Sequence, residues 1–232
     1  EPINITKEAL KFANNVISQM ILGYRCLDES HSDELLSLVR EVTEAFGEFN
    51  LSDFLPFLKN IDIHGSKKKA HSIRQRYDEY LERCMVRKEE ERKKNKGNQN
   101  SKSFLDMLMD VVESENTEIT LTRNHIKGLL MDYLTAGTDS LAVTLEWAMK
   151  EMLAKRGTFG RIREEMRAEI GEKRLVKETD MGKLRYLEAV IKETFRLHPP
   201  IPVILRGSKE ECEVKGYTIE KETLLIVNVW AI

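Results

Sequence analysis

Residues 122–155 read TRNHIKGLLMDYLTAGTDSLAVTLEWAMKEMLAK, and this stretch decides the fold. Wound as a helix, it is apolar over most of its circumference, and at 1.5 Å per residue an unbroken helix of this length spans about 50 Å. A helix that is apolar almost all round is typical of the centre of a helical body. We therefore expect a mainly α-helical protein built around this segment.

Amphipathic helices are predicted on both sides of this central segment. Apolar residues recur every three to four positions in residues 6–24, 35–46, 70–96, 103–114, 159–170 and 184–197. The apolar stretch 51–58, interrupted by Pro56, is predicted to form a short surface helix. Because proline cannot continue a helix, His198-Pro199-Pro200 ends the last one.

Beyond these prolines the pattern changes to short β-branched runs, which indicate strands. They occupy residues 203–205, 211–214, 217–219 and 224–229. Lys215-Gly216 lies between the second and third runs and predicts a hairpin turn. The sequence thus predicts a helical part over residues 1–198 and a β-rich part over 199–232, and the length fits one large domain or two small ones.

Composition excludes several classes of protein. The 232 residues include 37 Lys+Arg and 39 Asp+Glu, which argues against a basic nucleic-acid binder and against an acidic tail protein. Cys26, Cys84 and Cys212 are odd in number and far apart, which excludes a disulfide framework and a Cys-x-x-Cys metal site. The five histidines show no paired metal-ligand spacing, and no apolar run reaches the roughly 18 residues that a membrane span needs.

The motif Ala136-Gly137-Thr138-Asp139-Ser140 interrupts the apolar character of the central helix. Glycine, aspartate and serine are all poor residues for a helix interior. Either the helix ends and restarts here, with Asp139 or Ser140 as N-cap, or it widens locally and places a carboxyl and a hydroxyl beside a buried cavity. A buried acid and alcohol suit proton relay, because a hydroxyl both accepts and donates.

A second candidate is the pair Glu193 and Arg196, three residues apart on the last helix. The same spacing occurs twice more, where we expect solvated helix faces, at Glu89/Arg92 and Glu164/Arg167. The third pair differs in its apolar neighbours, Leu187, Val190, Ile191 and Leu197. We therefore expect Glu193 and Arg196 to form a buried ion pair.

Arg206 follows directly after the apolar run Ile201–Leu205. An arginine in this position is either a strand-edge residue whose charged end reaches solvent or a bidentate partner for a carboxylate or phosphate ligand. A non-enzymatic scaffold built on the charged helix 70–96 is the competing class of function. That reading leaves Asp139 and Ser140 unexplained, as well as the run from Pro199 to Arg206.

In this order, these motifs resemble the cytochrome P450 family. Ala136–Ser140 is similar to its oxygen-activation motif, and Glu193–Arg196 followed by Leu-His-Pro-Pro is similar to its Glu-x-x-Arg helix. Glu146-Trp147 and Asn50–Asp53 resemble plant microsomal members, closest in look to flavone synthase II and isoflavonoid-type oxidases. Ser140 stands where the family usually has threonine, and the substitution keeps the hydroxyl.

The resemblance implies a role for each candidate residue. Asp139 and Ser140 would be catalytic and deliver protons, Ala136 and Gly137 would let the helix approach haem b, and Arg206 would bind a haem propionate. Glu193 and Arg196 would form a structural ion pair. Residues 129–135 and 201–205 would line the substrate pocket, chiefly through Thr135, Ile201, Val203 and Ile204.

The resemblance also implies parts outside this chain: an N-terminal membrane anchor and a C-terminal loop with the cysteine that ligates the haem iron. We expect residues 1–232 to be the central part of a single domain, the catalytic domain of a haem-thiolate monooxygenase. That enzyme would use O2 and take electrons from NADPH through NADPH-cytochrome P450 reductase. The expected substrate is a small apolar or phenolic plant metabolite such as a flavonoid, and the expected location is the cytosolic face of the endoplasmic reticulum membrane. The alternative is a catalytically inactive truncated fragment.

Overall fold

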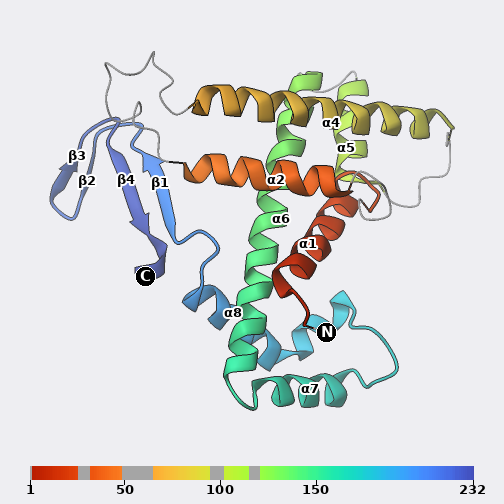
Figure 1. Ribbon diagram of the computed structural model, residues 1–232. Coiled ribbons are helices and arrows are strands. Elements are labelled where there is room, and N and C mark those ends of the chain that lie inside the picture. The colour runs from red at the N-terminus through yellow and green to blue at the C-terminus, as the bar shows by residue number, and fades with distance from the viewer. Residues whose placement is uncertain (1, 26–31, 49–64, 95–101, 115–120) are drawn as a thin grey trace. The chain divides into compact units, whose positions relative to one another are not determined.

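The computed structural model describes residues 2–25, 32–48, 65–94, 102–114 and 121–232. By its contacts the chain divides into two compact units, Glu1–Ala142 and Val143–Ile232, and each is described by itself. Helices dominate both units, and the strands lie at the C-terminal end of the chain (Figure 1). A mainly α fold with a small β region is therefore confirmed, whereas a single domain over 1–232 stays a prediction.

The first unit is helical. Its elements are α1 (Ile5–Ile21), α2 (Ser32–Gly47), α4 (Ser66–Lys94), α5 (Phe104–Glu113) and the first part of α6 (Arg123–Ala154). Their apolar stripes meet in one core, which includes Leu38, Tyr77, Leu81, Leu105 and Leu130. The predicted surface helix over 51–58 lies outside the described residues.

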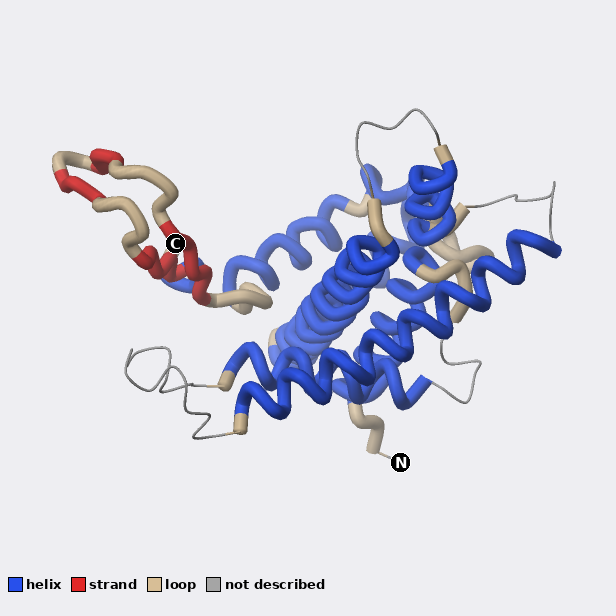
Figure 2. The backbone as a smooth tube through the Cα atoms, turned by 90° about the horizontal axis from the view of Figure 1, so that it is seen from above, coloured by secondary structure: helices blue, strands red, loops and turns tan. Residues whose placement is uncertain are grey.

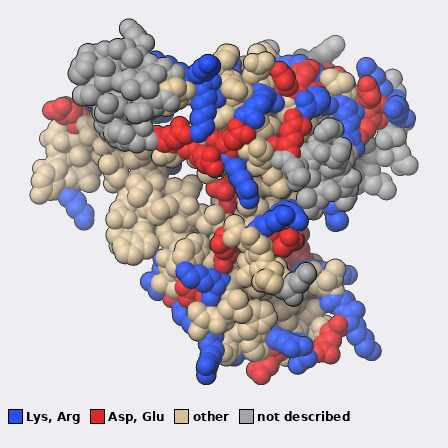
Figure 3. Space-filling view, in the orientation of Figure 1, with Lys and Arg blue, Asp and Glu red and all other residues tan. Residues whose placement is uncertain are grey.

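Charged side chains hold the outer faces of these helices together. Arg123 of α6 binds Glu82 and Glu89 of α4, and Lys127 binds Asp78 and Glu82. Because Arg123 and Lys127 both donate hydrogen bonds to it, the pKa of Glu82 is lowered to about 2. Blue and red side chains accordingly interleave over the surface of the α2 and α4 region (Figure 3).

The start of α5 is fixed by a capping box. The Ser103 hydroxyl accepts a hydrogen bond from the Asp106 amide, and the Asp106 carboxylate accepts one from the Ser103 amide. Lys88 of α4 lies 2.9 Å from Asp106 Oδ2, so α4 and α5 are joined by an ion pair whose carboxylate is buried.

Helix α6 is continuous and α-helical at every residue from Arg123 to Ala154. Its buried residues form one stripe: Ile126, Lys127, Leu130, Leu134, Thr138 and Ala142. The expectation that it is buried almost all round is wrong for this chain, since Tyr133 and Leu153 are 52% and 63% exposed. Among the described helices, none is both long enough and apolar enough to cross a membrane.

The second unit contains the end of α6 followed by α7 (Thr158–Glu169), the 3-10 helix η3 (Glu178–Lys183) and α8 (Arg185–Leu197). Four strands follow: β1 (Val203–Gly207), β2 (Cys212–Val214), β3 (Tyr217–Ile219) and β4 (Leu224–Asn228). The last predicted strand ends one residue early, because Val229–Ala231 turns into the 3-10 helix η4, capped by the Asn228 side chain.

The strands form two antiparallel ladders, β1 with β4 and β2 with β3 (Figure 2). In the first ladder Arg206 is opposite Leu225 and Gly207 is opposite Leu224. The predicted hairpin at Lys215-Gly216 is confirmed: both residues have positive φ, of 51° and 82°, as a type I′ turn requires.

Candidate functional site

The motif Ala136–Ser140 lies in an unbroken part of α6, so both sequence interpretations of its backbone are wrong. The helix neither ends and restarts nor widens at this point. The Ser140 hydroxyl donates a 2.7 Å hydrogen bond to the Ala136 carbonyl one turn earlier. This local bond keeps a serine within the helix without interrupting it.

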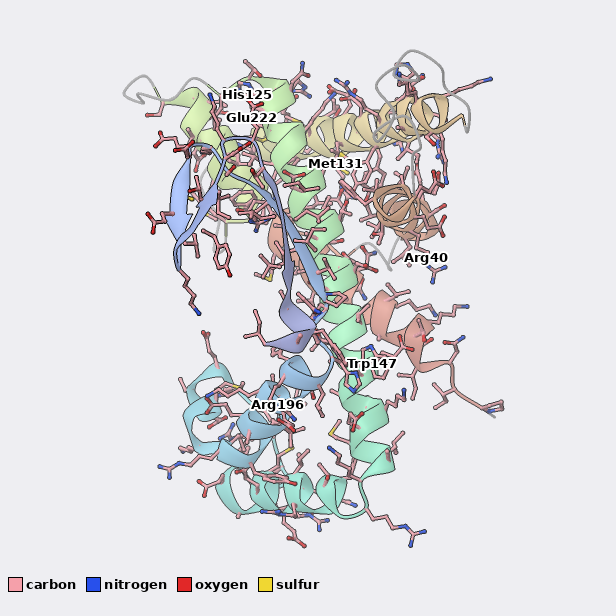
Figure 4. All side chains as sticks on the ribbon, turned by 90° about the vertical axis from the view of Figure 1, so that its left-hand side faces the viewer. Arg40, His125, Met131, Trp147, Arg196 and Glu222 are labelled. Carbon is pink, nitrogen blue, oxygen red and sulfur yellow. The ribbon has the colours of Figure 1, made fainter. Side chains whose placement is uncertain are left out.

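Asp139 is half-buried, and its surroundings shift the pKa of its carboxyl. Burial raises the pKa of Asp139, and the positive charge of Arg40 on α2 opposes that rise. Figure 4 labels Arg40 beside α2, which is seen end-on in that view. A carboxyl with a raised pKa holds its proton more readily near neutrality, which suits a group that passes protons on.

Gly137 is where α1 approaches α6. A Cβ atom placed on Gly137 would come within 3.0 Å of Ile17 Cδ1 and 3.3 Å of Ile17 Cγ1. The absence of a side chain at Gly137 therefore allows α1 to pack closely against α6. Ala136, next to Gly137, is exposed on the helix surface. The predicted roles of both residues beside a cofactor stay predictions.

Thr135, predicted to line a substrate pocket, is half-buried, and its hydroxyl lies 3.2 Å from the Tyr77 hydroxyl of α4. This pairing of two hydroxyls joins α4 to α6 one residue before the motif. Sequence reasoning missed the contributions of Tyr77, Arg40 and Thr138. The Thr138 side chain is fully buried, and its hydroxyl has no hydrogen-bond partner in the part of the chain described. Thr138 was detectable from its place in the motif, whereas no local signal marks Arg40 or Tyr77.

Glu193 and Arg196 form the predicted ion pair on α8, with two hydrogen bonds of 2.7 Å (Figure 4). The bonds lower the pKa of Glu193 and raise that of Arg196. The expectation of burial is wrong, however, since the two side chains are 48% and 66% exposed. Thr194 is the buried residue of α8, and the helix packs against α7 and η3. The apolar residues near the pair therefore lie on a different side of α8 from Glu193 and Arg196.

Arg206 is exposed on β1, and its Nη1 donates a 3.0 Å hydrogen bond to the Leu205 carbonyl. No ion pair to Arg206 exists among the residues that the structure describes. The predicted pocket residues Ile201 and Val203 are exposed, and Ile204 is half-buried. They precede Arg206 on the same short segment, so the second unit presents apolar side chains next to an available guanidinium group.

A mostly apolar cavity of about 270 Å³ lies between the end of α6, α7 and α8. Glu193, Thr194 and Leu197 contribute to its lining, together with Glu151 and Tyr186. None of the predicted substrate-pocket residues lines it. Within the described ranges, no group of three or more histidine, cysteine, aspartate or glutamate side chains could hold a metal ion.

The two cysteines in the described ranges differ in setting. Cys84 is buried and accepts a 3.1 Å hydrogen bond from the Tyr24 hydroxyl, and Cys212 is exposed on β2. Cys26 lies outside the described residues.

Comparison with known proteins agrees with this arrangement. The family model "Cytochrome P450" matches residues 1–232. Cytochrome P450 93B2 of Gerbera hybrida is 49% identical over all of this chain and 46% of its own length. A 2-hydroxyisoflavanone synthase of Glycyrrhiza echinata is 40% identical over all of this chain and 44% of its own length. The crystal structure of a cytochrome P450 (CYP102L1) matches 99% of this chain and 51% of its own chain with a TM-score of 0.78, at 20% identity.

The fold and the ordered motifs thus define a cytochrome P450 architecture. The chain belongs to the cytochrome P450 family. It spans about half the length of the curated relatives it matches.

Proposed function

We propose that the protein that carries this chain is a haem-thiolate monooxygenase that oxidises a small apolar or phenolic plant metabolite such as a flavonoid. Membership of the family supports the reaction class. The substrate class is supported by relatives such as the 2-hydroxyisoflavanone synthase. The observation that carries the proposal is the half-buried Asp139 on the unbroken α6, with Ser140 as its immediate neighbour.

The residues present fit part of a haem site. Arg206 has guanidinium nitrogens that are not used in ion pairs within the described ranges, and such a group binds a carboxylate in bidentate fashion. We therefore assign Arg206 to a haem propionate and the exposed Ala136 to the face of α6 that meets the haem, with Gly137 beside it. We place the cysteine ligand outside these 232 residues. Cys84 is buried in the helical core and Cys212 lies in a hairpin. Cys26 is not preceded by the Phe-x-x-Gly-x-x-x sequence of the family's haem-ligand loop.

When bound, haem supplies the iron that activates O2. The contribution of this chain is to move protons. Burial raises the pKa of Asp139 and Arg40 limits that rise, so this carboxyl keeps its proton to a higher pH than a solvated aspartate does. We assign to it the transfer of protons. The Ser140 hydroxyl donates to the Ala136 carbonyl at rest, and it becomes a donor to a neighbouring oxygen only by rotating away from that bond.

Thr135, Ile201, Val203 and Ile204 are proposed to contact the substrate. Electrons are proposed to come from NADPH through NADPH-cytochrome P450 reductase. The location is proposed to be the cytosolic face of the endoplasmic reticulum membrane, reached through segments other than those described.

The test is turnover by the full-length gene product. When the protein is incubated with O2, NADPH, the reductase and a flavanone, it should yield a product that has gained one oxygen atom. The yield should depend on NADPH. Absence of oxidation across flavanones, isoflavonoids and triterpenes would contradict the proposed substrate class.

The inactive-fragment alternative is tested on the 232-residue chain itself. The chain is mixed with haem and reductant under carbon monoxide. Without a cysteine ligand, it should give no thiolate-type Soret band. A thiolate-type band would show that our placement of the ligand is wrong.

A further inference from the structure

His198 is the cap of α8 and the last residue before the prolines. Its amide donates to the Thr194 carbonyl at 2.8 Å, which closes the final turn of the helix. Its imidazole stacks on the indole of Trp147 in α6, with ring centroids 3.8 Å apart and planes only 7° from parallel. Its Nε2 lies 2.8 Å from Glu151 Oε1, also on α6. One side chain thus makes two different contacts with one helix.

The two partners on α6 are spaced to receive this ring. Trp147 and Glu151 are four residues apart and therefore lie on the same face of the helix, one turn from each other. The Lys150 ammonium lies 3.9 Å from the centre of the same indole, and Lys155 lies 3.5 Å from the Glu151 carboxylate. The hydrogen bond with His198 lowers the pKa of Glu151. An ionised carboxylate can only accept, so His198 Nε2 is the donor when Glu151 is ionised.

The segment that follows His198 is unusually stiff. Proline fixes φ near −65°, and Pro199, Pro200 and Pro202 occupy three of the four positions before β1. The Pro202 carbonyl also accepts a hydrogen bond of 3.2 Å from the Trp230 amide, which ties this segment to the end of β4. The three fixed φ angles and this hydrogen bond together limit how far β1 can reorient relative to His198.

We propose that His198 is a positioning residue: by stacking on Trp147 and bonding to Glu151 it fixes the exit of α8 to α6, and the prolines transmit that orientation to the strand that bears Arg206. The value of this anchor for haem rests on the function proposed above. The anchor itself does not, so its test uses the 232-residue chain without haem.

The first measurement is the accessibility of Trp147. The chain has two tryptophans, and replacing the exposed Trp230 by phenylalanine leaves Trp147 as the single reporter. In this background, His198→Ala should raise the acrylamide quenching constant about twofold, because one face of the indole is uncovered. His198→Phe should restore the lower constant, and His198→Gln, which keeps a partner for Glu151 but no ring, should not.

The matched control is His71→Ala, since His71 is exposed on α4, in the other unit. It should leave the quenching constant unchanged. An unchanged constant in His198→Ala, or restoration by glutamine rather than by phenylalanine, would overturn the stacked anchor.

The second measurement follows the strands. An acceptor dye on the exposed Cys212, with Cys26→Ser, reports its distance from Trp147 by time-resolved energy transfer. We expect one narrow distance distribution in the parent chain and its loss in His198→Ala. Replacing both Pro199 and Pro200 by glycine should also broaden the distribution while leaving the quenching of Trp147 unchanged. A distribution as narrow in His198→Ala as in the parent would overturn the positioning role.

Discussion

Ile17 of α1 packs directly against the backbone of Gly137 in α6, and three of its side-chain carbons lie within 3.4 Å of where a Cβ on Gly137 would be. Through this contact α1 packs against the motif that carries Asp139 and Ser140. The motif is therefore constrained from the core side by packing, independently of any ligand.

Gly137→Ala should destabilise the chain by about 1 kcal/mol or more, because isoleucine is stiff at χ1 and overpacking exceeds the helix-propensity gain of alanine. Gly128→Ala is the matched control on the same helix, since its added Cβ meets no atom within 4 Å. It should stabilise the chain by up to about 1 kcal/mol. Urea denaturation measures both, and equal stabilisation by the two changes would contradict the packing role of Gly137.

Asp106→Ala should cost about 3 kcal/mol, because it removes the carboxylate half of the capping box of α5 and leaves the Lys88 ammonium without its buried partner. Burial alone would raise the pKa of Asp106, but hydrogen bonds from Ser103 and Lys88 outweigh it and hold that pKa below its usual value. A lowered pKa means that this stability is present at neutral pH and is lost as the pH falls through that pKa.

The pH dependence of unfolding checks this assignment. The parent chain should lose stability in acid more steeply than Asp106→Ala does. Asp132→Ala, on the exposed part of α6, should change the free energy of unfolding by no more than about 0.5 kcal/mol. Parallel pH profiles for the parent and Asp106→Ala would rule out the lowered pKa.

Glu193→Gln should leave the free energy of unfolding of this chain nearly unchanged, because the pair with Arg196 is exposed and a solvated pair contributes little. Had the pair been buried, removing one partner would cost several kcal/mol. Chemical denaturation of the variant therefore measures directly whether the pair is exposed in solution.

Asp139→Asn should stabilise the chain at neutral pH. The folded pKa of Asp139 is raised above that of the unfolded chain, so ionisation costs stability as the pH rises through the carboxyl range. Arg40→Ala should raise the pKa of Asp139 further, because it removes the opposing positive charge. Urea denaturation at neutral pH measures the stability of Asp139→Asn, and a loss of stability would contradict the raised pKa. A carboxyl titration by NMR, with Asp139 assigned, measures the effect of Arg40→Ala, and a fall in the pKa of Asp139 would contradict the role of Arg40.

Local patterns were sufficient to predict most of the fold. The apolar spacing located the described helices, and Lys215-Gly216 located the hairpin. What they did not predict are contacts between distant residues, such as Tyr77 with Thr135 or Trp147 with His198. The period of a helix shows that it has an apolar face but not which neighbour covers it.

The same limit explains the wrong prediction for Glu193 and Arg196. Their apolar neighbours along the sequence are real, but a residue one position away on a helix points about 100° around the axis. Thr194 is buried, whereas Glu193 beside it is largely exposed. Sequence proximity to apolar residues was therefore a poor guide to burial.

The coupling ratio of the full-length enzyme measures whether Asp139 passes protons in a monooxygenase. Product formed per NADPH consumed should fall by about tenfold or more in Asp139→Asn, because a positioned acid is removed. Asp78→Asn, a matched change at an exposed position on α4, should keep the parent ratio. An unchanged ratio in Asp139→Asn would remove Asp139 from the proton relay and contradict the account.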